Sequence, residues 1–430
     1  MMKTPGGGGE GMAVAEIQGL YGAFSFPEKL LQQIWLRGDF DTRDLCTADG
    51  RSLEVLHPGR WNLLGGPDFT GARLRIDGVV TTGDVELHLH AADWRAHGHA
   101  ADPAYAKVIL HVVLFPGGDQ MTAGFGGQAL PLLALLPLLH HDLEEYAADA
   151  AVERLANHPL TRAHETLAAL SEEALRAELN RHARERWSQK VRYAKIRIDR
   201  LGWAEACHHT ALEILGYRAN RAAMLAVAAV HPLEAWSKLT AAAERDAFVA
   251  EIMAQSGVLW RWRAQGVRPA NHPRTRFLQY AEWAGTCPDW PGRLIAFSEK
   301  LPDGIEKGGR PVTTADLRKL GGFRVLKSRF ADEVSGGVIG GSRFNTLICD
   351  GFLPLLAARD PAQLDALGIW WTNWFPGDAP AKWLVLLRGL GVIGSREWPA
   401  SHGALQGLLG WLIAEEKKQN SGDSVEGRGT

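Results

Sequence analysis

The residues best suited to chemistry lie in one stretch of the sequence, between Asn62 and His111. At its centre, Asp84-Val-Glu-Leu-His-Leu-His90, carboxylates and imidazoles alternate with apolar residues. Alternate side chains of a β-strand point to the same face, so Asp84, Glu86, His88 and His90 are expected to share one face while the apolar residues point into a core. A solvated sheet face also carries ionisable groups, but carboxylates mixed with imidazoles are good ligands for a divalent metal ion.

Further acids and histidines lie on both sides of this strand. Asp68 stands at the start of an expected strand, and a hairpin turn at Asp77-Gly78 would bring it beside Glu86. The following loop adds the secondary candidates Asp93, His97 and His99, in the kind of segment where catalytic groups are often found.

Two other polar residues of this stretch have structural interpretations. Asp102 precedes Pro103 and suits the N-cap of a short helix as well as it suits a site. His111 lies in an otherwise apolar strand, where a histidine is more often a hydrogen-bonded core residue than a ligand. We therefore expect His111 to be structural.

These residues need a defined set of elements to position them. The spacing of apolar residues predicts an amphipathic helix within residues 27–40 and strands at 52–57, 72–76 and 84–90. A short helix at 102–107 and a buried strand at 108–115 are expected to follow. The predicted order is helix, three strands, helix, strand.

The length of the chain, 430 residues, predicts more than one domain. The fold class expected is α+β: an α/β domain over residues 21–127, ending in a glycine-rich loop, and a larger, mostly α-helical domain over residues 128–418. Residues 1–20 and 419–430 are expected to be disordered tails.

The composition limits the partners and the location. Lys and Arg number 47 against 49 Asp and Glu, so nucleic-acid binding would need a local basic patch. The basic stretch from Arg181 to Arg200 is one candidate, with Arg192 and Lys195 as contacts, although a solvated helix face would look the same. The four cysteines form no C-x-x-C pair, and no segment is long and apolar enough to cross a membrane. A cytoplasmic protein without membrane contact is expected.

Several motifs resemble those of the bacterial family DUF2851. They are Gly66-Pro67-Asp68-Phe69, Gly83-Asp84-Val85-Glu86-Leu87-His88, Asp93-Trp94, His97-Gly98-His99 and Leu110-His111-Val112-Val113, together with Arg268-Pro269-Ala270-Asn271 in the helical half. The likeness covers most of the chain. The name of that family implies no established activity.

The predicted order of elements is also similar to the core of the PD-(D/E)XK nuclease superfamily, which carries an Asp entering its second strand and Glu-x-Lys on its third. Asp68 and Glu86 fall at the acidic positions, and His88 replaces the lysine. The resemblance implies phosphodiester hydrolysis, with Asp68 and Glu86 holding Mg²⁺ or Mn²⁺ and nucleic acid as the partner. A neutral imidazole serves as a base near pH 7, although it lacks the lysine's fixed charge. Asp84 and His90 are further candidate ligands.

Two alternatives remain open. His88-Leu89-His90 is also the H-x-H pair of cupins and metal-dependent hydrolases, which bind Zn²⁺, Fe²⁺ or Mn²⁺; too few strands are expected after Phe115 for a cupin barrel. The second alternative is a nuclease fold that has lost catalysis and serves as a binding or scaffold module.

Overall fold

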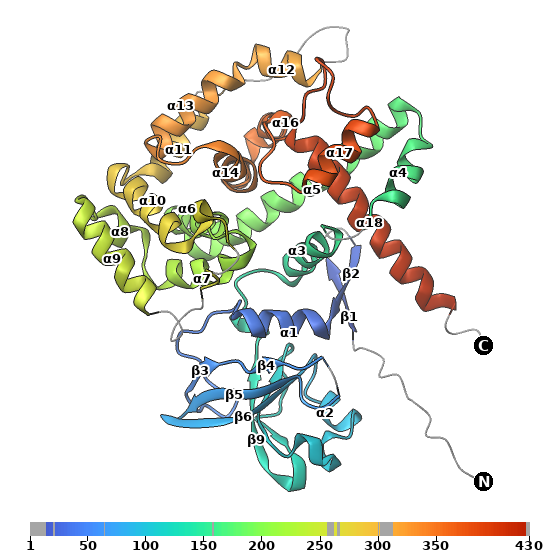
Figure 1. Cartoon of the computed structure of the whole chain (residues 1–430), viewed down its shortest axis with the longest axis vertical. Helices are drawn as coiled ribbons and strands as arrows, with labels where there is room; N and C mark the ends of the chain where they lie inside the picture. The colour runs from blue at the N-terminus through green and yellow to red at the C-terminus, as the bar shows by residue number, and fades with distance from the viewer. Residues whose placement is uncertain are drawn as a thin grey trace. The chain divides into compact units, whose positions relative to one another are not determined.

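The structure is a computed structural model, and it describes residues 14–19, 22–63, 65–156, 159–255, 262–264, 267–299, 301 and 313–426. The chain divides after Ala147 into two compact units, an α/β unit and a larger helical unit (Figure 1). Each unit has its own core. The mixed α and β class predicted from the sequence is confirmed.

The α/β unit is built on a seven-stranded mixed sheet with the strand order β3-β5-β6-β7-β9-β8, in which β4 also pairs with β5. The strands are β3 Leu53–His57, β4 Arg60–Trp61, β5 Phe69–Ile76, β6 Val79–His88, β7 Val108–Val113, β8 Met121–Ala123 and β9 Ala129–Ala134. A separate pair is formed by β1 Val14–Gly19 and β2 Gly22–Pro27. Strands β3, β5 and β6 are antiparallel neighbours, whereas β6, β7 and β9 run parallel.

The helices of this unit are short. They are α1 Glu28–Arg37, α2 Asp93–Ala96 and the 3₁₀ turns η1 His99–Ala101, η2 Pro103–Tyr105, η3 Phe125–Gly127 and η4 Leu136–Leu138. Helix α3 Leu143–Leu155 begins in this unit and continues past Ala147 into the helical unit. Helix α1 buries the predicted apolar face and contacts β6. The segment α2–η1–η2 connects the parallel strands β6 and β7, which cannot be joined by a tight turn.

The hairpin between β5 and β6 turns at the predicted position. Asp77 and Gly78 have φ angles of 48° and 80°, and two consecutive left-handed residues are typical of a two-residue hairpin turn. The turn sets the register that pairs Phe69 with Val85 and Ile76 with Val79. It thereby places Asp68 beside the second half of β6.

The sheet continues past residue 127, the boundary predicted from the sequence, because β9 follows it and joins the sheet between β7 and β8. The strand's sequence, Ala-Leu-Pro-Leu-Leu-Ala, is apolar throughout because β9 is largely buried, so it lacks the alternation that marks a half-exposed strand. The predicted tails are also too long: β1 occupies Val14–Gly19, and the last helix continues to Glu426. Residues 1–13 and 427–430 lie outside the described part of the chain.

The second unit is helical throughout its described residues, with short connecting turns. Its helices are α4 Thr161–Ala168, α5 Glu172–Leu201, α6 Trp203–Leu215, α7 Tyr217–Val230, α8 Leu233–Ser237, α9 Ala242–Ala254, η5 Pro269–Asn271, α10 Pro273–Thr286, α11 Trp290–Ser298, α12 Thr314–Leu320, α13 Phe323–Ser335, α14 Gly341–Thr346, the π-helical turn η6 Leu347–Phe352, α15 Leu353–Arg359, η7 Pro361–Gln363, α16 Leu364–Asn373, α17 Ala381–Gly389 and α18 His402–Glu426.

The long helices α5 and α18, green and red in Figure 1, pack side by side. Gly407 of α18 meets the backbone of Leu179 on α5, where any side chain would collide with the Leu179 carbonyl oxygen. Leu175, Leu179, Leu405 and Leu408 belong to the core between these helices. In the described part of the chain, no helix is both long and apolar enough to span a membrane.

Candidate metal centre

Glu86 and His88 are the central pair of the site. Both lie on β6, which runs between β5 and β7, and the two residues are only 5% and 1% exposed. The strand alternation places them on one face, with Glu86 Oε1 3.6 Å from His88 Nε2. Each is an ionisable group in the interior of the sheet, and such groups need a partner there.

Two more histidines come from the connection that follows β6. His97 is the C-cap residue of helix α2, and Gly98, with φ of 75°, reverses the chain so that His99 begins η1. His97 Nδ1 lies 3.2 Å from His88 Nε2, and His99 Nε2 lies 3.5 Å from Glu86 Oε1. One ring nitrogen from each of His88, His97 and His99 lies within 4.8 Å of the other two.

These distances fit the spacing that a tetrahedral ion imposes on its ligands. Metal–nitrogen and metal–oxygen bonds of about 2.0 to 2.2 Å place neighbouring ligand atoms roughly 3.3 to 3.5 Å apart. The separations from His88 Nε2 to His97 Nδ1 and to Glu86 Oε1 are 3.2 and 3.6 Å. His99 Nε2 is buried and has no hydrogen-bond partner in the described part of the chain. A metal ion would give that nitrogen a partner.

The buried imidazoles are neutral. Burial, together with the neighbouring histidines, lowers the pKa of His88 to about 2 and that of His99 to about 4. A neutral imidazole carries the nitrogen lone pair that a metal ligand needs. The neutral state that these pKa values indicate is the one in which the histidines could bind a metal ion, and their spacing also suits such an ion.

Two hydrogen bonds on the side away from the histidine group fix the orientation of the His88 ring. His88 Nδ1 lies 2.9 Å from His111 Nε2, and His111 Nδ1 lies 2.7 Å from Thr122 Oγ1. If the lone pair on Nε2 of His88 faces the site, its Nδ1–H donates to His111, and the Nδ1–H of His111 donates to the Thr122 hydroxyl. Such outer contacts fix the tautomer and the orientation of metal-binding histidines. His111 is thus a hydrogen-bonded core residue, as expected, and its partner is His88.

Aromatic rings form the wall around His99. Its ring stacks on Tyr105 at 3.8 Å between centroids and meets the edge of Trp94 at 5.3 Å. Trp94 and Tyr105 are buried in a small core with Val108 and Leu130. His97 is exposed, so it is the member of the group that solvent reaches first.

Asp68 supports Glu86 through its backbone. The Asp68 N–H donates to Glu86 Oε2 at 2.9 Å, which leaves Oε1 toward the histidines. The Asp68 carboxylate accepts from Gln32 Nε2 at 2.6 Å and from the Leu87 N–H at 3.0 Å, and burial raises its pKa to about 6. In the described part of this unit, the residues whose ligand atoms converge are His88, His97 and His99, and Asp68 is not among them.

The structure does not bring Asp84 and His90 to the histidine group. The register of β6 against β7 shifts between Asp84 and Val85, and Asp84 Oδ1 accepts the N–H of Gly71 on β5. His90 lies beyond the end of β6, exposed, with its ring stacked on Phe115 at 4.9 Å. Asp93 accepts the N–H of His90 at 2.9 Å and so stabilises the turn before α2.

Comparison with known proteins identifies the family. The model of the family described as "Protein of unknown function (DUF2851)" matches residues 28–261, more than half of the chain. The chain belongs to the DUF2851 family. No curated protein and no solved structure matches it. The match includes every residue of the centre described above, so the histidine group lies within the part that defines the likeness to DUF2851.

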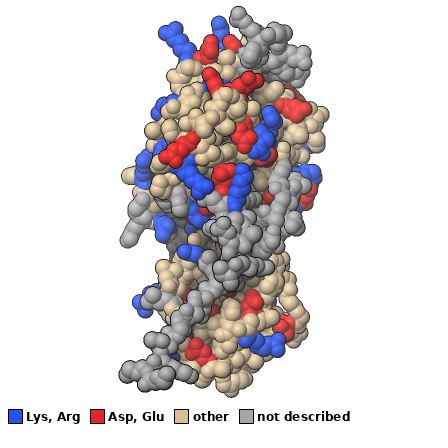
Figure 2. All heavy atoms as spheres, turned by 90° about the vertical axis from the view of Figure 1, so that its right-hand side faces the viewer, with Lys and Arg blue, Asp and Glu red and all other residues tan. Residues whose placement is uncertain are grey.

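The basic stretch of this DUF2851 protein lies on α5, and several of its charges form ion pairs. Lys195 forms an ion pair with Asp199, Arg181 with Glu178 and Glu185, and Arg197 with Glu213. On the face that Figure 2 shows, basic and acidic side chains are interspersed. Arg192 lies over the Tyr193 ring at 5.8 Å. Nucleic-acid binding by Arg192 and Lys195 therefore stays a prediction.

Sequence reasoning missed two supporting residues of the DUF2851 centre. Gln32 is a polar position of α1, and its amide joins Asp68 to the indole N–H of Trp61. Thr122 lies on the three-residue strand β8 after a loop rich in glycine. No sequence pattern marks either residue, because each acts through a contact far away in the chain. Asp102, in contrast, caps η2 as expected.

Proposed function

We propose that this protein is a metal-dependent hydrolase, that His88, His97, His99 and Glu86 form its centre, and that its substrate is a phosphodiester. The observation that supports this most directly is the convergence of three imidazole nitrogens within 4.8 Å. Glu86 Oε1 lies beside two of them. Buried histidines and a buried carboxylate at this spacing are better explained by a resident cation than by packing.

The donor set favours a transition metal. Imidazole nitrogens suit Zn²⁺, Mn²⁺ and Fe²⁺, whereas Mg²⁺ prefers oxygen ligands. Of the two ions expected from the sequence, Mn²⁺ fits better. A divalent ion held by these residues would supply a Lewis acid for hydrolysis.

Contacts around the ligands hold them in place. Glu86 is fixed through Oε2 by the Asp68 N–H, so its Oε1 faces the histidines as a ligand for the cation. Thr122 and His111 hold His88 in one tautomer. The exposed His97 marks the side from which a substrate enters.

The choice of a phosphodiester rests on the arrangement of the elements. A helix, three antiparallel strands, a helical connection and a parallel strand occur in the order α1, β3, β5, β6, α2–η2 and β7, with the two-residue strand β4 between β3 and β5. Asp68 directly precedes β5, and Glu86 and His88 lie two residues apart on β6. This agrees with the order and the acidic positions of PD-(D/E)XK nucleases, with His88 at the lysine position. The proposed partner is therefore nucleic acid.

Metal binding and hydrolysis are tested together. Chelator-treated protein is titrated with Mn²⁺ and with Zn²⁺, the bound metal is measured by mass spectrometry, and hydrolysis of bis(p-nitrophenyl) phosphate and of labelled DNA and RNA is followed. We expect His99→Gln to lose the metal, and Glu86→Gln, which replaces a charged ligand by a neutral one, to lose about 10²-fold or more in turnover. His90→Gln is the matched control, because His90 is an exposed histidine outside the group.

The competing proposal is a non-catalytic binding or scaffold module. A metal-loaded wild type that cleaves none of these phosphodiesters would refute the hydrolase and leave the scaffold. In that case Asp68→Ala and Glu86→Ala would fold and keep partner binding unchanged. A wild type that binds no metal would refute the centre itself.

A further inference from the structure

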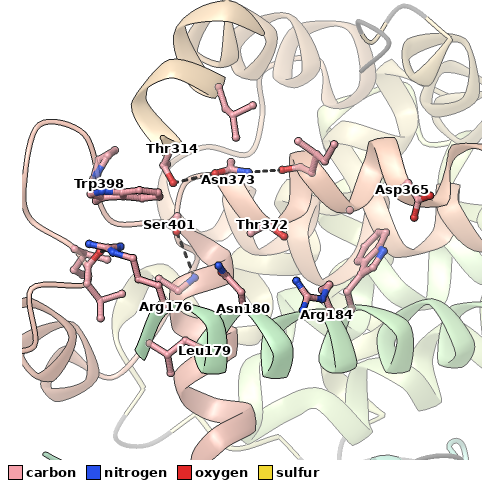
Figure 3. Close-up of a pocket in the computed structure, with 18 of the residues that line it drawn as sticks. Arg176, Leu179, Asn180, Arg184, Thr314, Asp365, Thr372, Asn373, Trp398 and Ser401 are labelled. Atoms are coloured by element: carbon pink, nitrogen blue, oxygen red, sulfur yellow. Dashed lines mark hydrogen bonds between the residues drawn. The ribbon is translucent and has the colours of Figure 1, made fainter. Parts of the chain in front are cut away.

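The helical unit contains a pocket of about 620 Å³ that the proposed hydrolase centre does not use. One wall is the face of α5 from Arg176 to Ser188, and the other is α16 from Leu364 to Asn373. Figure 3 shows Asn180 and Arg184 on α5 and Thr372 and Asp365 on α16. Sites for small molecules typically have volumes of about 300 to 1,000 Å³.

At one end of the pocket, the polar side chains form hydrogen bonds with other groups of the protein. The Arg176 guanidinium donates to the carbonyl oxygens of Gly391 and Val392 at 3.0 and 3.1 Å and lies over the Trp398 ring at 4.3 Å. Thr314 donates to Asn373, which donates to the Ile369 carbonyl oxygen (Figure 3). These groups shape the pocket and have few free hydrogen-bonding positions for a ligand.

The other end carries polar groups without partners. Within the described residues, neither Arg184 nor Asp365 has an ion-pair partner within 4.0 Å, although both line the same pocket from opposite walls. The side chains of Asn180 and Thr372 likewise make no hydrogen bond to a described residue. A cation, an anion, an amide and a hydroxyl without partners among the described residues thus line one pocket.

The lining between these groups is apolar. Leu179, Trp187, Ile369 and Ile393 contribute to it. Trp187 lies against Gly368 of α16, where a Cβ would come within 3.0 Å of the indole nitrogen. The absence of a side chain at Gly368 therefore lets the indole form part of the wall.

We propose that this pocket binds a small zwitterion with an apolar side chain, an α-amino acid or a dipeptide. Arg184 and Asn180 would take the carboxylate, because a guanidinium and an amide N–H₂ are donors. Asp365 and the Thr372 hydroxyl would take the ammonium group. A ligand with a single charge would form an ion pair with only one of the two side chains. A zwitterion satisfies both.

Isothermal titration with L-phenylalanine and with L-leucyl-L-phenylalanine tests the proposal on the full chain. We expect saturable binding of at least one of them. N-acetyl-L-phenylalanine and L-phenylalaninamide, which each lack one charge, should bind at least tenfold more weakly than L-phenylalanine, as should the corresponding blocked dipeptides relative to the free one. Comparing the two free probes distinguishes an amino acid from a dipeptide.

The variants Arg184→Gln and Asp365→Asn should each weaken the binding at least tenfold. Both side chains are exposed, so the variants should fold, which circular dichroism verifies. Arg324→Gln and Asp332→Asn on α13 are the matched controls, since these residues are also exposed charges but lie outside the pocket. The proposal is overturned if neither probe binds, if AMP binds more tightly than both, or if Arg184→Gln and Asp365→Asn bind as the wild type does.

Discussion

Thr122 affects the candidate centre although it touches none of the converging nitrogens. Its hydroxyl oxygen lies 2.7 Å from His111 Nδ1, and His111 in turn holds His88. Removing the hydroxyl leaves a buried N–H without an acceptor and releases the ring orientation of His88. The effect should appear in metal affinity more than in folding.

We therefore expect Thr122→Val to weaken Mn²⁺ or Zn²⁺ binding by about 10-fold or more, the usual effect of losing an outer hydrogen bond to a metal ligand. Competition with a chromogenic chelator measures the affinity. Thr122→Ser keeps the hydroxyl and should restore it. Equal affinity in Thr122→Val and the wild type would show that the chain of hydrogen bonds has no role at the centre.

His208 makes the stability of the helical unit depend on pH. It is fully buried, with Nδ1 2.5 Å from the Tyr280 hydroxyl and Nε2 2.9 Å from the His231 carbonyl oxygen, and burial lowers its pKa to about 3. In the unfolded chain His208 takes up a proton near pH 6.5, whereas in the folded chain it stays neutral until the pH approaches 3. Stability from this residue is thus present above pH 6.5 and is lost as the pH falls toward 3.

We predict that urea unfolding of the metal-free protein shows a free energy of unfolding that falls between pH 6.5 and 5. His208 alone should contribute a slope approaching ~1.4 kcal/mol per pH unit. His208→Gln should have a shallower slope, whereas His164→Gln, at an exposed position, should keep that of the wild type. An unchanged slope in His208→Gln would contradict the assignment.

At the scale of elements, the packing of α18 on α5 depends on a residue without a side chain. Gly407→Ala would push a methyl group into the Leu179 carbonyl oxygen, so the helices must separate. We expect a loss of about 1–3 kcal/mol in the free energy of unfolding, the usual cost of overpacking. Gly389→Ala on α17 is the control, since a Cβ there meets nothing within 4 Å and alanine favours a helix. Equal stability of the two variants would disprove the close approach.

The sequence predicts those elements whose periodicity is visible. Helix α1 and strands β3, β5, β6 and β7 were all expected, because a buried face or an apolar run marks each of them. Strand β9 was missed because it is apolar on both faces and contains Pro131. Periodicity distinguishes a half-exposed strand from a helix, but it carries no signal where both faces are covered.

The candidate site was predictable to a similar extent. Alternation correctly paired Glu86 with His88, because β6 is regular there. It failed at Asp84, whose carboxylate accepts the Gly71 N–H where β5 and β7 each carry an extra residue opposite β6; such irregularities depend on the neighbouring strands. His97 and His99 were recognised as a loop pair, but the left-handed turn at Gly98 decides where they point.

At the scale of the whole molecule, the two candidate sites belong to different compact units. The histidine group lies before Ala147, and the pocket between α5 and α16 lies after it. Hydrogen exchange should therefore separate them. Mn²⁺ is expected to slow exchange in β6, β7 and the segment α2–η1 while leaving α16 unchanged. L-Phenylalanine should slow exchange in α16 and leave β6, β7 and the segment α2–η1 unchanged. Slower exchange in both units with a single ligand would contradict the assignment of two separate sites.

The connection from Glu86 to His99 has a consequence for biosynthesis. The proposed ligands lie close together along the chain, so the loop that must close to gather them is short and its entropic cost is small. Because they precede β7 and β9 in the chain, all of them emerge from the ribosome before those two strands do. A nascent chain can thus capture its cation early, and His111 and Thr122 then lock an arrangement that the ion has already organised.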